Sequence, residues 1–332
     1  MENKPENVME NEFESKAQKK AMKKAAKSEK KAKKRAERIS LNKKYRRRFG
    51  DRSDGRKIRS MDPMNMVSPY IMKKRNDANN MVSVSIDIEN IEKYIKKKRA
   101  EGLKGFGLLH VMLATYVKTI AQRPGINRFI SGQKVFARHD IQIMMTIKKE
   151  MKLDAQETVV KAYYSPDNSP EEVYRIFNQL VEENKAQGDK SDFDSTARIL
   201  NYIPGLFLKF AVWLLNLLDY FGLLPKFLLK VSPFHGSFFI TSMGSLGIPA
   251  IYHHLYNFGN VPLFCSYSAK RYEYVLNKDG VAEKRKFVDF KFVMDERICD
   301  GHYYASALKL MCDYLKNPDK LDQPVEVIPD IY

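Results

Sequence analysis

A chain of 332 residues, 44% of them hydrophobic and 30% charged, has the composition of a globular protein with room for one large domain and extensions. The formal net charge of +18 is unevenly placed, because residues 16–48 contain 17 Lys and Arg against two Glu. Most of the positive charge therefore belongs to the segment over residues 16–48, and the net charge excludes few function classes for the globular part.

Residues 1–48 form the first expected element, a Lys/Ala-rich arm. It has no apolar stripe to bury and its like charges repel at i,i+4 spacing, so we expect it to be solvated, either disordered or helical. Such an arm can contact RNA or anionic lipid, or it can be a solubilising tail with weak, non-specific polyanion binding. Its acidic start lacks the apolar core of a secretory signal. Three cysteines without a CxxC spacing indicate core packing in a reducing compartment, which predicts a cytoplasmic protein.

The globular region is expected to run over residues 49–325, with a short tail over 326–332. In chain order, its first half predicts a strand over 81–88, a helix over 88–101, a central apolar helix stopped by Pro124, single strands within 133–150 and 154–165, and a helix over 169–187.

Residues 199–231 form an apolar segment that charged residues divide into runs of ten residues or fewer. These runs are too short to span a bilayer, which needs roughly 20 residues. Gly222 and Pro225 predict two short helices joined by a turn, with the only tryptophan, Trp213, at the centre. We expect this hairpin to be covered, either by the domain or an oligomer interface, or by contact with a membrane surface.

The last third is rich in strands. In order, it predicts a strand with a Ser/Gly turn over 235–247, a strand over 261–268, two strands joined by a hairpin turn at 277–280, and a helix from Gly301 that ends before Pro318. The expected fold class is α+β, a mixed sheet with helices packed against it. No GxGxxG or P-loop is present, and the tandem His253-His254 has no third ligand at metal spacing, so no metal site is predicted and both histidines are expected to be structural.

Four charged residues follow the apolar strand near residue 294, and the chain then enters the last helix. The stretch reads "DERICDG" and is followed by "LKNPDKL"; upstream lie "FFITSMGSLG" and "INRFISGQKVFARHDIQIMMTI". Over about residues 60–325, the order of these motifs along the chain resembles that in the catalytic domain of the 2-oxo acid dehydrogenase dihydrolipoyl acyltransferases and the related chloramphenicol acetyltransferases. The resemblance implies a chloramphenicol acetyltransferase-like mixed sheet.

The resemblance also implies acyl transfer to or from a thiol such as that of coenzyme A, in sites formed between the subunits of a trimer. Coenzyme A or acyl-CoA would be a substrate, with no covalently bound cofactor. By position, Thr241 is the implied donor to the tetrahedral oxyanion, with Ser242 as its alternative. The resemblance also implies that Asp295 and Arg297 hold the loop in place. Asp300 is the acid implied to pair with Lys74 or Arg75. Gly301 is implied to permit a tight turn from strand to helix.

Glu296 stands where the family has the histidine that removes the thiol proton. An ordinary glutamate lies about four pKa units below a thiol, which makes unassisted proton abstraction unfavourable by about 5–6 kcal/mol. His302, in the first turn of the last helix, is an alternative base, although a place on the helix surface or in an interface is the plainer interpretation. The family's lipoyl and partner-binding domains are not found in residues 1–60, so we do not expect a core subunit of a conventional dehydrogenase complex.

Two functions stay open at the level of the sequence. One is a CoA-dependent acyltransferase, a homotrimer or a multiple of it, that uses Glu296 or a water-assisted group as the base. The other is a catalytically inactive acyl-binding or CoA-binding protein, or a scaffold, at a membrane surface. For this second function, residues 16–48 and 199–231 supply two separate membrane signals. Specific nucleic-acid binding ranks last, because no aromatic stacking pattern accompanies the basic arm.

Overall fold

The computed structural model describes residues 48–148, 157–186 and 202–330. Residues from Arg52 onward form one unit, and the four described residues before it, 48–51, make a turn that belongs to a separate N-terminal unit. Residues 1–47 of the expected arm and residues 199–201 of the expected hairpin lie outside the described residues.

The main sheet is mixed, as the sequence predicts. Its strands, in spatial order, are β2 (Asn79–Asp87), β10 (Ala282–Asp295), β8 (Leu263–Tyr267), β7 (Phe238–Ser242), β5 (Ile141–Lys148) and β6 (Glu157–Tyr164), and β9 (Arg271–Leu276) pairs with the first half of β10. The pairs β5–β7 and β7–β8 are parallel, and the other pairs are antiparallel.

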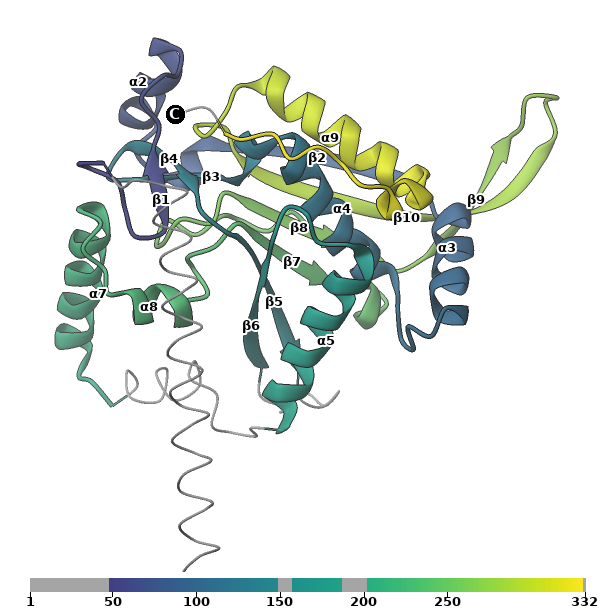
Figure 1. Ribbon diagram of the computed structural model, residues 1–332, viewed down its shortest axis with the longest axis horizontal. Helices are drawn as coiled ribbons and strands as arrows, with labels where there is room; N and C mark the ends of the chain where they lie inside the picture. The colour runs from purple at the N-terminus through teal and green to yellow at the C-terminus, as the bar shows by residue number, and fades with distance from the viewer. Residues whose placement is uncertain (1–47, 149–156, 187–201, 331–332) are drawn as a thin grey trace, which may run out of the picture. The chain divides into compact units, whose positions relative to one another are not determined.

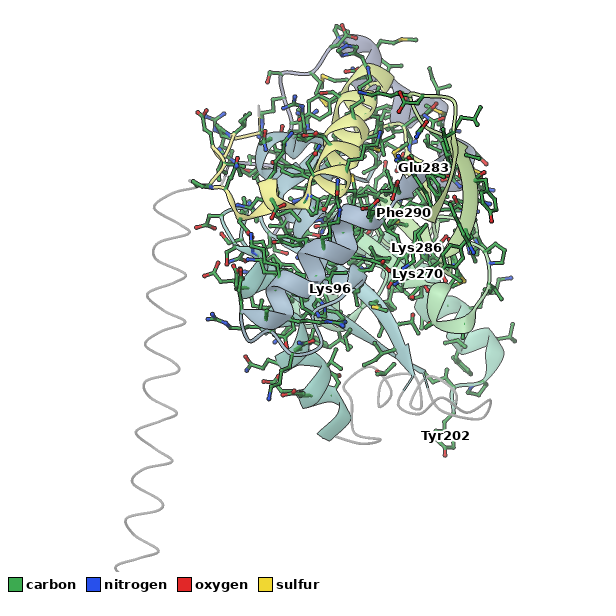
Figure 2. The ribbon with its side chains drawn as sticks, turned by 90° about the vertical axis from the view of Figure 1, so that its right-hand side faces the viewer. Lys96, Tyr202, Lys270, Glu283, Lys286 and Phe290 are labelled. Carbon is green, nitrogen blue, oxygen red and sulfur yellow. The ribbon has the colours of Figure 1, made fainter. Side chains whose placement is uncertain are left out.

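Four helices lie over one face of this sheet (Figure 1): α3 (Glu89–Ala100), α4 (Leu108–Gln122), α5 (Pro170–Ala186) and α9 (Gly301–Lys316). Helix α4 is buried along nearly its whole length, which explains why its sequence is apolar on most sides. Phe290 of β10 lies within the core (Figure 2). At the edge of the sheet, Lys270 and Lys286, which Figure 2 shows side by side, both form ion pairs with Glu92 of α3.

A second sheet contains three short strands, β1 (Gly55–Lys57), β4 (Lys134–Arg138) and β3 (Arg128–Ser131). The prediction of a single strand over 133–150 is therefore wrong. The chain turns at His139 and Asp140, so β4 joins the small sheet and β5 joins the main one. Asp140 stabilises this turn, because its carbonyl oxygen accepts a hydrogen bond from the side-chain amide of Asn127 at 3.1 Å.

In the described part of the chain, the remaining helical elements are α2 (Pro63–Ile71), α7 (Gly205–Tyr220), α8 (Lys226–Val231) and the short 3₁₀ segments η1 (Arg75–Ala78), η2 (Pro124–Asn127), η4 (Gly244–Leu246) and η5 (Pro318–Asp322). Helices α7 and α8 confirm the predicted pair joined by a turn. Within the described ranges, no helix has the length and apolar character needed to cross a membrane.

Candidate active site

The loop after β10 is built around one buried carboxylate. Asp295 is 0% exposed, and its two oxygens accept hydrogen bonds from Nε and Nη2 of Arg297, each at 2.7 Å. The Nε of Arg75 donates to the same carboxylate at 3.3 Å, and both arginines are buried. Two of the charged residues that follow the strand are thus explained as a structural ion-pair cluster, since buried charges are stable only when they are paired.

The two guanidinium groups connect this cluster to two other segments. Arg297 donates to the carbonyl of Met72 at 2.9 Å, and Arg75 donates to the carbonyls of Tyr256 at 2.5 Å and Gly259 at 3.0 Å. Burial lowers the pKa of Arg75, and the nearby Asp295 carboxylate opposes that shift. The cluster therefore fixes the end of β10 against the segment before β2 and the loop before β8.

Two expectations for this loop are corrected. Among the described residues, Asp300 forms no ion pair with an arginine: it is exposed, and its carboxylate accepts the backbone N–H of Tyr303 at 2.9 Å as the N-cap of α9. The acid that binds Arg75 is Asp295, and Lys74 is exposed. Gly301 has no left-handed backbone angle, and a Cβ there would meet no atom within 4 Å, so the turn into α9 does not require glycine.

Glu296 is half-buried. Unlike the side chains of the other charged residues of this loop, its side chain has no contact that stabilises the loop among the described residues. Its backbone N–H donates to the carbonyl of Ala78 at 3.0 Å. Among the described residues, its carboxylate has no hydrogen bond or ion pair. His302 is exposed on the first turn of α9, in a hollow that it shares with Arg123 and Lys309.

Thr241 and Ser242 line a cavity of about 490 Å³ at the other end of the sheet. The parallel pairing of β5 with β7 covers only residues 143–145 and 238–240, after which the two strands continue without pairing to each other. The cavity opens where they separate. Its walls are mostly apolar and include Leu109 of α4, Phe177 and Val181 of α5, and Ile147, Phe239 and Phe264 of the strands.

The hydroxyl groups of Thr241 and Ser242, two of those that line this cavity, differ in their hydrogen-bond partners. Ser242 Oγ accepts the backbone N–H of Ser245 at 3.3 Å, in the turn that follows β7. In the described part of the chain, the side chain of Thr241 has no hydrogen-bond partner. Of these two hydroxyl groups, that of Thr241 is therefore the one free to donate to a bound ligand.

His253 lines the same cavity, a placement that the sequence did not predict. Its ring stacks on Phe264, with ring centroids 4.1 Å apart and an interplanar angle of 5°. Nδ1 lies 2.8 Å from the carbonyl oxygen of His254, which can only accept, so Nδ1 carries the proton and Nε2 keeps its lone pair. Burial lowers the pKa of His253, and the ring is uncharged at neutral pH. The sequence did contain a signal for this role, because a histidine is a common general base. A base, unlike a metal site, needs no further ligand residues nearby.

Thr241 and Glu296 lie at opposite ends of the sheet in one chain. The strand register places Thr241 beside Ser266, and Ser266 beside Lys291 of β10, five residues before Glu296. At a rise of about 3.3 Å per residue and a strand spacing of about 4.8 Å, the two residues are roughly 20 Å apart. A single chain therefore does not bring the expected base and the expected oxyanion donor together.

No protein-family model matches the sequence, and no curated protein matches it. Among solved structures, a probable dihydrolipoamide acetyltransferase from Listeria monocytogenes is 16% identical, with 78% of this chain and 95% of that chain covered and a TM-score of 0.50. The cubic core of a pyruvate dehydrogenase multienzyme complex is 14% identical, with 78% and 88% covered and a TM-score of 0.51. The dihydrolipoamide acetyltransferase of Azotobacter vinelandii is also 14% identical, with 79% and 93% covered and a TM-score of 0.51.

At these identities the likeness concerns the fold. The chain has the α+β acyltransferase-like fold of the catalytic cores of 2-oxo acid dehydrogenase complexes, as the sequence predicts.

Proposed function

We propose that the protein binds an acyl thioester of coenzyme A in the cavity between β5 and β7 and transfers the acyl group to a second thiol. The observation that carries this proposal is the mostly apolar cavity of about 490 Å³ on whose wall Thr241 lies, in a chain with the fold of acetyltransferase cores. Apolar walls suit an acyl chain, and a hydroxyl without another partner suits the carbonyl oxygen of a thioester.

In the proposed reaction, a base removes the proton of the acceptor thiol, and the thiolate attacks the thioester carbonyl. Thr241 donates a hydrogen bond to the oxyanion of the tetrahedral intermediate. The bond from carbon to the first sulfur then breaks, and the base returns the proton to the leaving thiolate. Atoms and charge balance without any further reactant.

His253 is the base that the geometry favours. It lies in the same cavity as Thr241, it is uncharged at neutral pH, and its Nε2 has a free lone pair. The pKa gap to a thiol is about two units for an ordinary histidine and about four for an ordinary glutamate. Burial lowers the pKa of His253, so its own gap is wider than that of an ordinary histidine. Glu296 would act on the same substrate only if a second chain brought it to the cavity, as in a homotrimer. The cubic core among the similar structures supports such an assembly as part of the proposal.

The test is acyl exchange between acetyl-CoA and isotopically labelled coenzyme A. We expect Thr241→Val to lower the exchange rate about 100-fold, the usual effect of losing one oxyanion donor. His253→Gln should lower it by about 100-fold or more, as expected for the loss of a general base. Glu283→Gln, in the first half of β10 and outside the cavity lining, is the matched control and should leave the rate unchanged. Binding of acetyl-CoA by calorimetry, measured for each variant, separates lost chemistry from lost binding.

Glu296→Gln and Glu296→His complete the series. Loss of exchange in Glu296→Gln, with His253→Gln unaffected, would contradict His253 as the base and assign the role to Glu296 across a subunit interface. Exchange that appears only in Glu296→His would identify a site that has lost its base. That outcome, with binding retained in the parent, would favour the second function, an inactive acyl-binding or CoA-binding protein. Both functions fit a reducing cytoplasm, where coenzyme A thioesters occur and the three cysteines stay free.

A further inference from the structure

Helix α7 presents an apolar outer face to solvent and lies apart from the four helices that cover the sheet (Figure 1). At 100° per residue, one side of the helix, an arc of about 140°, carries only apolar and aromatic residues. They are Leu206, Phe207, Phe210, Trp213, Leu214, Leu217 and Tyr220. Leu206 is 84% exposed, Phe210 59% and Trp213 55%. Tyr202, just before the helix, also projects away from the other side chains (Figure 2).

The opposite side of α7 is apolar as well, apart from Asp219. Leu208, Ala211, Leu215 and Leu218 face that way and are partly covered. A helix that is apolar on nearly all sides is stable only when something covers it. Exposed apolar patches of this kind mark a binding surface.

A polar cluster anchors the C-terminal end of α7. The carboxylate of Asp219 accepts from Nη2 of Arg52 at 2.7 Å, and its carbonyl accepts from Nη1 of Arg52 at 2.6 Å and from the hydroxyl of Ser131 at 2.9 Å. Asp219 is buried, and Nε2 of His235 lies 3.6 Å from the same carboxylate oxygen that Arg52 contacts. The helix is thus held firmly at one end, while its outer face stays open along its length.

The charges of the hairpin indicate what the outer face contacts. Residues 205–231 are all described, and their exposed charges are Lys209, Lys226 and Lys230. The single acid, Asp219, is neutralised by Arg52 inside the protein. Aromatic side chains beside lysines are typical of a helix that lies in the interface of an anionic membrane. A second copy of the same face would instead bring lysines toward lysines.

We propose that α7 lies flat on an anionic lipid surface, with its outer face in the boundary between headgroups and acyl chains. The lysines of the hairpin contact lipid phosphates, and the basic segment over residues 16–48 adds a second, electrostatic attraction. One weak signal gives marginal binding, and two together give firm attachment. This docking is independent of the acyl-transfer chemistry proposed above.

Trp213 makes the proposal directly testable, because it is the only tryptophan of the chain and lies within the proposed face. Emission of the full-length protein is recorded with vesicles of phosphatidylcholine containing about 30% phosphatidylglycerol, a fraction chosen to give the anionic surface that attracts lysines. We expect a blue shift, and quenching when the acyl chains are brominated. Vesicles of phosphatidylcholine alone should bind more weakly, and added salt should lower the affinity for the anionic vesicles.

The variant Phe207→Ser/Phe210→Ser keeps the reporter and removes two exposed aromatic rings. We expect it to bind the anionic vesicles at least about tenfold more weakly, because binding scales with the buried apolar area. Tyr274→Ser/Leu276→Ser on β9 is the matched control, since both side chains are as exposed as the two phenylalanines, and its binding should be unchanged.

Two outcomes would overturn the proposal. Co-sedimentation with vesicles without any change in Trp213 emission would mean that the basic segment binds alone and α7 stays in water. Emission that shifts with protein concentration, and is unaffected by brominated lipid, would mean that a second chain covers the outer face.

Discussion

Asp295→Asn tests whether the ion-pair cluster holds the candidate site together. The carboxylate accepts four hydrogen bonds, three from Arg297, including its backbone N–H at 3.2 Å, and one from Arg75. An asparagine keeps one acceptor oxygen and turns an N–H group toward two buried guanidinium groups. Two charged hydrogen bonds are lost at about 1.5–3 kcal/mol each, which agrees with about 3–5 kcal/mol for breaking a buried ion pair.

We therefore expect Asp295→Asn to lower the free energy of unfolding by about 4 kcal/mol, or the Tm by about 10 °C for a domain of this size. Urea unfolding followed by circular dichroism measures the change. Glu296→Gln is the matched control at the neighbouring position, and because its carboxylate has no partner among the described residues, it should change stability by less than about 0.5 kcal/mol. A loss below about 1 kcal/mol in Asp295→Asn, or equal losses in both variants, would refute the assignment of the cluster as the structural clamp.

Three further predictions concern stability. Burial alone would raise the pKa of Asp219, but His235 and Arg52 lower it from 3.8 to about 2. A carboxyl group whose pKa is lower in the folded than in the unfolded protein stabilises the fold at pH values above its unfolded-state pKa. About 2 kcal/mol of the free energy of unfolding should therefore be lost as the pH falls from about 4 to 2. Asp219→Asn should be less stable than the parent at pH 7 and converge with it near pH 2; unfolding curves that stay parallel would contradict this. Gly301→Ala should leave the thermal midpoint unchanged or slightly raised. Gly259→Ala should cost about 2 kcal/mol or more, because Gly259 has φ +82° and a Cβ there would lie 2.0 Å from the carbonyl oxygen of Phe234.

The sequence predicts most of the fold, because periodicity and turn residues act locally. It fails at His139 and Asp140, where the alternation of β4 continues almost in phase into β5, and only the pairing partners show that two sheets are involved. A two-residue polar turn keeps the period-2 alternation in phase, so the break between the strands is decided by tertiary contacts.

The candidate site was less predictable, since its pairs join distant segments. Asp295 and Arg75 are 220 residues apart, and the family pattern suggested Asp300 as the acid. A local signal pointed to the correct role of Asp300, because an aspartate directly before a helix is an N-cap. His253 reaches the cavity through the loop after β7, and no local pattern indicates which strands that loop contacts.

The opposite positions of Thr241 and Glu296 make the activity of mixtures informative. In a trimer whose sites take Glu296 from one chain and Thr241 from the next, two inactive variants can complement each other. Random assembly of equal amounts of Thr241→Val and Glu296→Gln would leave about one quarter of such sites with both residues intact. A mixture of Thr241→Val and His253→Gln would restore nothing, because one chain supplies both residues to one cavity. The strand register thus determines which pairs of damaged subunits can rescue each other.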